Sequence, residues 1–268
     1  MIEFAELNCL PCPVRVEYQW LNVERRDAPI AIFLHEGLGS IALWKAWLQV
    51  LCDRLKCRGL VYSRPDYGRS TPRRPEEKWP IEFLHQQAQD VLPALLDALG
   101  IDMSERKRMW LIGHSDGGSI ALLYACAFPD ALAGLAIMAP HVLVENMTVE
   151  AIAEVKNAFE HCELSGKLRP YHDDVSSAFY GWNDAWLSAP FRDWNIVEEL
   201  SSITRPLLAI QGYDDEYASM VQLDEIKASV KHAQLLKLEN CRHSPHRDMP
   251  DIINENIAAF VQAHSLSV

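Results

Sequence analysis

The sequence predicts an α/β fold: a mostly parallel sheet with helices on both faces and one helical insertion. Short runs of β-branched and aliphatic residues alternate with longer stretches of helical period, which is the pattern of strands joined by crossover helices. That alternation stops between residues 141 and 204, where helical segments replace the expected strands. We therefore expect one core formed by residues 1–140 and 205–268, with residues 141–204 inserted into it.

The predicted strands are short and follow one another along the core. An alternating run at residues 14–20 predicts an early antiparallel edge strand. Six further runs predict buried or half-buried strands at residues 30–34, 59–62, 109–112, 135–138, 207–210 and 234–238.

Helices are expected between these strands, where apolar residues recur at helical spacing. The core segments are residues 81–99, 117–128 and 250–264. Pro93 would kink the first helix, and Gly100 would end it. The insertion carries six aromatic residues within a short span: Phe179, Tyr180, Trp182, Trp186, Phe191 and Trp194. They indicate either the packing of a small subdomain or the lining of an apolar pocket.

The composition is that of an ordinary globular protein. The chain has 268 residues, of which 49% are hydrophobic and 23% are charged, and this suits a single core. Its formal net charge of -12 argues against nucleic acid or a membrane surface as partner, because both require clustered Lys and Arg. A small-molecule substrate fits better. The residues do not decide between a monomer and a homodimer.

The N-terminus and the cysteines predict a cytoplasmic protein. Glu3 and Glu6 come early, and the segment lacks the basic and apolar regions of a signal peptide. Seven cysteines are an odd number in a chain large enough to fold without disulfides, so free thiols are expected. Cys9 and Cys12 have C-x-x-C spacing, but no second Cys or His pair follows at zinc-site spacing. We therefore expect neither a metal nor a cofactor.

The segment Gly113-His114-Ser115-Asp116-Gly117-Gly118 follows a predicted strand and precedes a predicted helix. A G-x-S-x-G nucleophile turn requires this context. Small residues relieve the crowding that arises where a strand turns sharply into a helix. Ser115 would project from the turn as the nucleophile, with the helix N-terminus helping to hold developing negative charge. A turn that merely binds an anion is the alternative.

A nucleophilic serine needs a base and an acid that orients the base. Candidates for both follow Ser115 in the chain, in the order serine, acid, histidine that is expected for this arrangement. Asp214, Asp215 and Glu216 come after the strand at residues 207–210 and compete for the role of the acid. His243 and His246 follow the last strand. We favour His243 as the base because it comes first after that strand, and we interpret His246 as a capping or surface residue.

The loop after the strand at residues 30–34 completes the candidate site. It reads His35-Glu36-Gly37-Leu38-Gly39-Ser40 and lies near the same sheet edge. Such a loop presents a backbone N–H to an oxyanion, and the N–H of Asp116 would be the second donor. We interpret His35 as a residue that organises this loop.

Together these residues resemble the α/β-hydrolase superfamily, over nearly the whole chain from His35 to His243. The resemblance implies an eight-stranded sheet and a triad of Ser115, Asp215 and His243. It selects Asp215 because the acid of the family usually stands three residues after a Gly, here Gly212. It also implies that the insertion is a helical cap, which usually covers the nucleophile and sets the choice of substrate.

Two positions depart from the family pattern. Glu36 stands where the family usually has Gly, so the first oxyanion donor is Gly37 or Leu38. A carboxylate there would repel an anionic substrate or bind one that carries a cation. Asp66 also replaces a usual Gly, in a segment similar to the family's D-x-R-G-x-G-x-S loop. The residues expected to line the substrate pocket are Glu36, His141, Tyr180, Trp182 and Trp186.

The leading functional hypothesis is hydrolysis of a small carboxylic ester or thioester through an acyl-enzyme. One alternative is cleavage of a carbon–carbon bond, or related lyase or perhydrolase chemistry, because this superfamily uses one constellation for several reactions. A second alternative is a non-catalytic protein that binds a small ligand. Its usual mark is a broken triad, whereas all three members are present here.

Overall fold

Eight strands form one sheet, which confirms the predicted fold class. The computed structural model describes residues 1–74 and 76–265. The strands are β1 (Ile2–Leu7), β2 (Val14–Leu21), β3 (Ile30–Leu34), β4 (Arg58–Tyr62), β5 (Trp110–His114), β6 (Gly134–Met138), β7 (Leu207–Gly212) and β8 (Gln234–Leu238). Their spatial order is β1-β2-β4-β3-β5-β6-β7-β8.

The sheet is antiparallel at one end and parallel over the rest. β1 pairs with β2 and β2 pairs with β4 in antiparallel fashion, whereas all further pairs from β4 to β8 are parallel. The prediction of an edge strand at residues 14–20 was wrong in one respect. β1 covers the outer side of β2, with Ile2 opposite Gln19 and Leu7 opposite Val14, so β1 is the edge.

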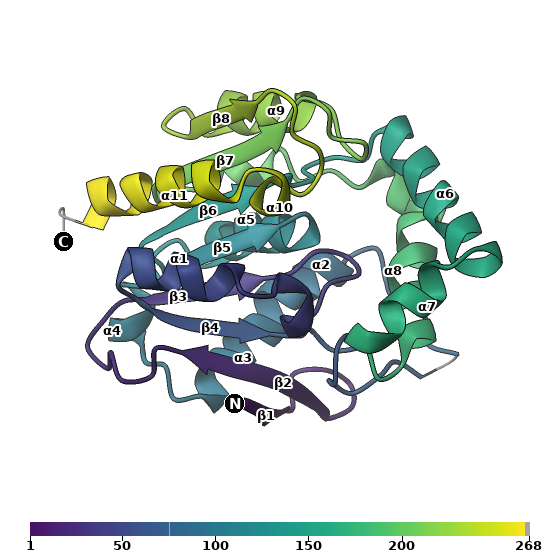
Figure 1. Ribbon diagram of the computed structural model, residues 1–268, viewed down its shortest axis with the longest axis horizontal. Helices are drawn as coiled ribbons and strands as arrows, with labels where there is room; N and C mark the ends of the chain where they lie inside the picture. Colours follow the sequence, from purple (N-terminus) through teal and green to yellow (C-terminus); the bar gives the residue numbers. More distant parts are fainter. Residues whose placement is uncertain (75, 266–268) are drawn as a thin grey trace.

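Helices cover both faces of the sheet (Figure 1). α1 (Trp47–Leu55) and α11 (Pro250–Ser265) pack together on one face. α2 (Phe83–Gln86), α3 (Leu92–Ala98) and α5 (Asp116–Ala127) lie on the other. The shorter helices are α4 (Met103–Arg106), α9 (Val221–Ser229) and α10 (Pro245–Asp248), with a 3-10 turn at Ile41–Trp44.

The expected kink at Pro93 takes the form of a π-helical turn. Residues Gln87–Val91 form this turn between α2 and α3, and Pro93 stands in the first turn of α3. Proline is tolerated at the start of a helix because the N–H groups there have no partner within the helix. Gly100 follows the helix with φ of +68°, a left-handed conformation in which glycine is unstrained.

The chain is helical between β6 and β7. α6 (Asn146–His161), α7 (Leu164–Leu168) and α8 (Val175–Trp186) stand together beside the sheet in Figure 1, followed by 3-10 turns at Pro190–Asp193 and Glu199–Ser202. A further 3-10 turn, Arg169–Tyr171, links α7 to α8. Trp182 of α8 packs against Gly37, which follows β3. The insertion therefore lies at the edge where the parallel strands end.

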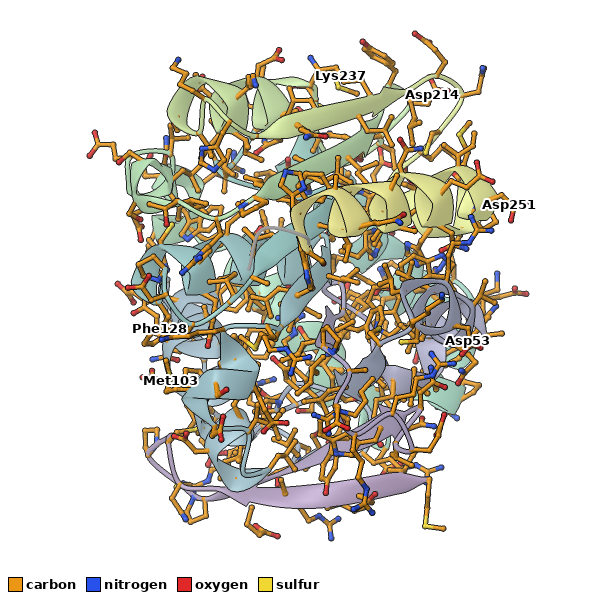
Figure 2. All side chains as sticks on the ribbon, turned by 90° about the vertical axis from the view of Figure 1, so that its left-hand side faces the viewer. Asp53, Met103, Phe128, Asp214, Lys237 and Asp251 are labelled. Carbon is orange, nitrogen blue, oxygen red and sulfur yellow. The ribbon has the colours of Figure 1, made fainter. Side chains whose placement is uncertain are left out.

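Two apolar clusters, one on each face of the sheet, form the core. Side chains fill the space on both sides of the sheet, as Figure 2 shows. All seven cysteines are free thiols, as expected. Among the described residues, no helix combines the length and the apolar character needed to cross a bilayer.

Candidate active site

Ser115 lies at the turn from β5 into α5. Its backbone has φ of 54° and ψ of -121°, which is a strained conformation for a residue with a side chain. The turn is held by hydrogen bonds: the Ser115 N–H donates to the carbonyl oxygen of Met138 at 2.9 Å, and the Ser115 carbonyl accepts from Gly118 at 2.8 Å. The side chain is thereby presented at the carboxyl edge of the sheet.

The glycines around Ser115 are required by close backbone approaches. A Cβ on Gly113 would overlap the carbonyl of Gly117, and a Cβ on Gly117 would overlap the carbonyl of Leu34. Gly118 is also tight, with Pro140 3.1 Å from the position of a Cβ. This geometry agrees with the steric reason for small residues at a nucleophile turn.

Ser115, His243 and Asp215 form a continuous hydrogen-bonded chain. His243 Nε2 lies 2.9 Å from Ser115 Oγ, and His243 Nδ1 lies 2.8 Å from Asp215 Oδ1. Because the carboxylate only accepts, Nδ1 carries the hydrogen and Nε2 is free to accept the serine proton. The three residues come from separate loops, after β5, β7 and β8. The arrangement is that of a nucleophile, a base and an orienting acid.

Asp215 is buried and is held by more than the histidine. Its Oδ1 also accepts from the N–H groups of Tyr217 at 2.9 Å and Ala218 at 3.2 Å, and its Oδ2 accepts from the Gln211 amide at 3.3 Å. Burial acts to raise the pKa of Asp215, but the hydrogen bond and the charge of His243 and the Tyr217 N–H outweigh it, so the pKa lies below its ordinary value. Asp215 is therefore ionised near neutral pH.

Gly212 brings the acid loop and the histidine loop together. A Cβ on Gly212 would overlap the carbonyl of Cys241, and that same carbonyl accepts from the Asp214 N–H at 3.0 Å. The Tyr213 N–H donates to Leu238 at 2.8 Å. The spacing that selected Asp215 from the family resemblance thus has a steric basis, because only glycine permits this approach.

The competing acids and bases occupy other positions. The Asp214 side chain is exposed, and Figure 2 shows it at the periphery of the molecule. Glu216 accepts from the backbone N–H of His243 at 3.2 Å rather than from its ring. The interpretation of His246 as a surface residue was wrong. Its ring is buried beside Trp44 and Trp47, with centroids 5.0 and 5.2 Å away, because it begins α10 on the face that packs on the core.

The loop after β3 is organised by His35, as its interpretation required. His35 Nδ1 donates to the carbonyl of Glu36 at 2.7 Å, and its Nε2 accepts from the Arg64 N–H at 3.0 Å. Burial lowers the pKa of His35 well below its ordinary value, and the charge of Arg64 adds to this effect. The ring therefore stays neutral. The predicted oxyanion donors Gly37, Leu38 and Asp116 all line the pocket beside Ser115.

Asp116 turns its side chain into the core. Its Oδ2 accepts from Arg64 Nη2 at 3.2 Å, and both side chains are 1% exposed. The same Arg64 nitrogen donates to the carbonyl of Glu36 at 3.0 Å. Burial raises the pKa of Asp116, against the opposing charge of Arg64. Arg64 thereby connects the loop after β3, which we call the oxyanion loop, to the start of α5.

A pocket of about 230 Å³ opens beside Ser115 and His243. Its apolar wall comes largely from the insertion. The lining side chains outside the triad include Glu36, Leu38, His141, Ile152, Trp182, Trp186, Glu216, Tyr217 and Arg247. Trp182 and Trp186 share one face of α8, since residues four apart on a helix lie one above the other. Burial lowers the pKa of His141 to about 3, so this imidazole is neutral in the pocket.

The structure does not place Tyr180 in this pocket. Two residues before Trp182 on α8, its side chain points to another face of the helix, and its hydroxyl contacts Glu160 at 3.3 Å. Tyr180 lines a separate groove of about 440 Å³ between α8 and the residues Arg73, Glu77, Lys78 and Trp79. That groove contains none of the triad, so we assign the site to the smaller pocket.

The two residues that depart from the family pattern, Glu36 and Asp66, have different surroundings. Glu36 faces the pocket, where its Oε1 accepts from Arg247 at 2.9 Å. Burial acts to raise the pKa of Glu36, but His114 and Arg247 outweigh it and hold the pKa well below its ordinary value. Asp66 has φ of 79°, a left-handed conformation that favours glycine, and its Oδ2 accepts from Trp79 Nε1 at 2.9 Å. Burial raises the pKa of Asp66 to about 7.

Comparison with known proteins agrees with this architecture. A sequence model described as "Alpha/beta hydrolase family" matches residues 31–256. This range includes Asp215, His243 and the sharp turn that carries Ser115, which is called the nucleophile elbow. The chain belongs to the alpha/beta hydrolase family. Its eight-stranded sheet is the α/β-hydrolase core, and the helices between β6 and β7 are inserted into that core.

Named relatives of this α/β-hydrolase are themselves hydrolases. It is 26% identical to the human protein "Serine hydrolase BPHL" over 201 residues, which are 73% of this chain and 66% of that protein. It is 24% identical to a proline iminopeptidase of Thermoplasma volcanium, over 93% of this chain and 94% of that one. A solved carboxylesterase of Nitrososphaera gargenis has a TM-score of 0.78 and 18% identity, over 99% of this chain and 100% of that one.

Several residues at the site were not predicted as functional from the sequence. Arg247 follows His246 in α10 and reaches Glu36, 211 residues earlier, so no local pattern could reveal it. Ile152 and Tyr217 also line the pocket. His114 is different, because its position directly before the nucleophile Ser115 is visible in the sequence. Among the described residues, no group of three or more His, Cys, Asp or Glu side chains is arranged to hold a metal.

Proposed function

We propose that this α/β-hydrolase cleaves a small carboxylic ester or thioester through an acyl-enzyme. The observation that carries the proposal is the 2.9 Å contact between Ser115 Oγ and His243 Nε2, with His243 Nδ1 bound to the ionised Asp215. This contact lets the serine lose its proton as it attacks a carbonyl carbon.

The reaction uses groups already in place. Ser115 Oγ bonds to the acyl carbon while its proton passes to His243 Nε2, and Asp215 stabilises the imidazolium. The backbone N–H groups of Asp116 and Gly37 donate hydrogen bonds to the carbonyl oxygen and stabilise the negative charge that forms on it. His243 then donates its proton to the leaving alcohol or thiol. A water molecule, deprotonated by the same histidine, hydrolyses the acyl-enzyme and releases the acid.

The pocket supports a small and uncharged substrate. Its volume of about 230 Å³ lies below the usual range for drug-sized ligands. Glu36 and Glu216 contribute two carboxylates to its lining, and Arg247 contributes one cation. An anionic acyl group would meet net repulsion there. We propose that the insertion, residues 141–204, acts as a cap over this pocket through Trp182 and Trp186.

The experiment is covalent labelling with a fluorophosphonate followed by turnover of a substrate panel. Wild-type protein should be labelled once, on Ser115, and Ser115→Ala should not be labelled. Ser201→Ala, an exposed serine in the insertion, is the matched control and should be labelled like wild type. Labelling that persists in Ser115→Ala would contradict the proposal.

The panel contains 4-nitrophenyl esters, acyl thioesters and ring-fission diketones. Turnover of the esters or thioesters that depends on Ser115 supports the proposed reaction. Turnover of diketones alone would instead assign carbon–carbon bond cleavage to the same triad. Tight binding of a metabolite without any turnover would favour the non-catalytic alternative.

A further inference from the structure

His114, the residue before the nucleophile, contacts the loop that carries the base. Its side chain is 1% exposed, and its Nε2 lies 2.7 Å from the backbone carbonyl oxygen of His243. A carbonyl oxygen only accepts, so this ring nitrogen carries a hydrogen and donates it. The contact joins the last residue of β5 to the histidine loop, which is 129 residues away in the chain.

The other ring nitrogen of His114 faces Glu36. Glu36 Oε2 lies 3.5 Å from His114 Nδ1, and Glu36 Oε1 accepts from Arg247 Nη2 at 2.9 Å. Only 16% of the Glu36 side chain is exposed, so this carboxylate is shielded between an imidazole and a guanidinium. The carboxylate lies at ion-pair distance from this edge of the ring and packs against it.

We propose that Glu36 and His114 are positioning residues that hold the backbone of the base His243 relative to the oxyanion loop. The inference rests on the proposed function, because it concerns the base of the same triad. It also gives a role to the largely buried carboxylate of this loop. Glu36 immediately precedes Gly37, so one side chain connects an oxyanion donor to the histidine loop through His114.

The remaining contacts of His243 show why this one matters. Its ring Nδ1 is bound by Asp215, and its backbone N–H donates to Glu216 at 3.2 Å. Both of these partners lie in the acid loop after β7. Only the His114 contact, among the hydrogen bonds of His243 in the described part of the chain, anchors the backbone to the elbow side of the site. Without it, the backbone of the base would be held from the acid loop alone, and the ring contact with Ser115 would be the remaining hydrogen bond to the nucleophile turn among the described residues.

Two amide substitutions separate positioning from simple packing. The side-chain nitrogen of glutamine reaches the place of a histidine Nε2, whereas that of asparagine reaches only the place of Nδ1. His114→Gln can therefore still donate to the His243 carbonyl, and His114→Asn cannot. Glu36→Gln removes the charge but keeps the shape, and Glu24→Gln, in an exposed loop, is the matched control.

The measurements are the rate of Ser115 labelling by a small fluorophosphonate and the kcat and KM for a 4-nitrophenyl ester. We expect His114→Asn to lower both the labelling rate and kcat about tenfold, with KM changed less than about twofold, since misplacement of a catalytic group acts on kcat. His114→Gln should recover most of that loss. Glu36→Gln should lower kcat about threefold to tenfold, and Glu24→Gln should match wild type.

The inference is overturned if His114→Asn and Glu36→Gln, both shown by thermal unfolding to be folded, keep wild-type kcat, or if their whole effect is on KM. It is also overturned if His114→Gln is as impaired as His114→Asn while equally stable. Should His114→Asn fail to fold, Glu36→Gln alone decides. A failure of the proposed function is seen separately, as labelling or turnover that does not depend on Ser115.

Discussion

Replacing Asp66 with asparagine should stabilise the protein, and more so at high pH. Asp66 sits at φ of 79°, a left-handed conformation that asparagine adopts more readily than most residues. The asparagine carbonyl oxygen can still accept from Trp79 Nε1, as Asp66 Oδ2 does at 2.9 Å. What the substitution removes is the cost of holding a buried negative charge.

The size of the effect follows from the pKa. Burial raises the pKa of Asp66 from 3.8 to about 7, so the folded protein holds this proton at pH values where the unfolded chain has lost it. Stability therefore falls as pH rises between these two values. From pH 5 to the folded pKa is about two units at about 1.4 kcal/mol each, which gives a loss of about 3 kcal/mol by pH 8.

Urea unfolding at pH 5 and pH 8 measures this directly. The free energy of unfolding of Asp66→Asn, minus that of wild type, should be about 3 kcal/mol larger at pH 8 than at pH 5. Other titrating groups cancel in this difference. Asp251→Asn, an exposed substitution on α11, is the control and should differ from wild type by less than about 0.5 kcal/mol. A difference for Asp66→Asn that does not change with pH would show that burial does not raise the pKa of Asp66.

Three further predictions concern the triad, the turn that carries Ser115 and the wall of the pocket. Asp215→Asn should lower kcat about 10⁴-fold. If the new amide oxygen accepts from His243 Nδ1, the amide NH₂ group faces the Gln211 NH₂ group, and two donors cannot pair. A kcat within tenfold of wild type would contradict this prediction. Gly117→Ala should lower the free energy of unfolding by about 3 kcal/mol or more, since its Cβ overlaps the Leu34 carbonyl, whereas Gly166→Ala, with open space around it, should gain up to about 1 kcal/mol. Equal effects in urea would overturn the steric argument. Trp182→Ala should raise kcat/KM for longer acyl chains relative to acetate, and an unchanged preference would remove Trp182 from the pocket wall.

Most of the parallel sheet was predictable because its strands are short runs rich in apolar residues, and all of them except β4 and β8 are buried along their whole length. The run at residues 30–34 matches β3, and the run at residues 234–238 matches β8. β1 was missed because its exposed, charged residues alternate with only a few buried ones, Ala5 and Leu7 among them. Its identity as a strand depends on pairing with β2, and a pairing partner is not visible in a single segment.

The aromatic residues of the insertion could be named but not assigned. Both interpretations hold in part: Phe179, Phe191 and Trp194 are packed in the core, whereas Trp182 and Trp186 also line the pocket. Tyr180 was expected in the pocket and is not there. Which face of α8 meets the sheet is decided by packing against the core, so composition alone could not separate these residues.

The residue pattern around Ser115 and the one before Asp215 were readable in the sequence alone. The elbow needs glycines at fixed offsets from the nucleophile, and Gly212 must precede the acid by a set distance, so both leave patterns within a few residues. Tertiary structure brought the ring of His243 to the hydroxyl of Ser115. It also placed Arg247 on Glu36 and joined His114 to the base. These contacts link residues more than a hundred positions apart, and only the packing of separate strands and loops at one sheet edge brings them within hydrogen-bonding distance.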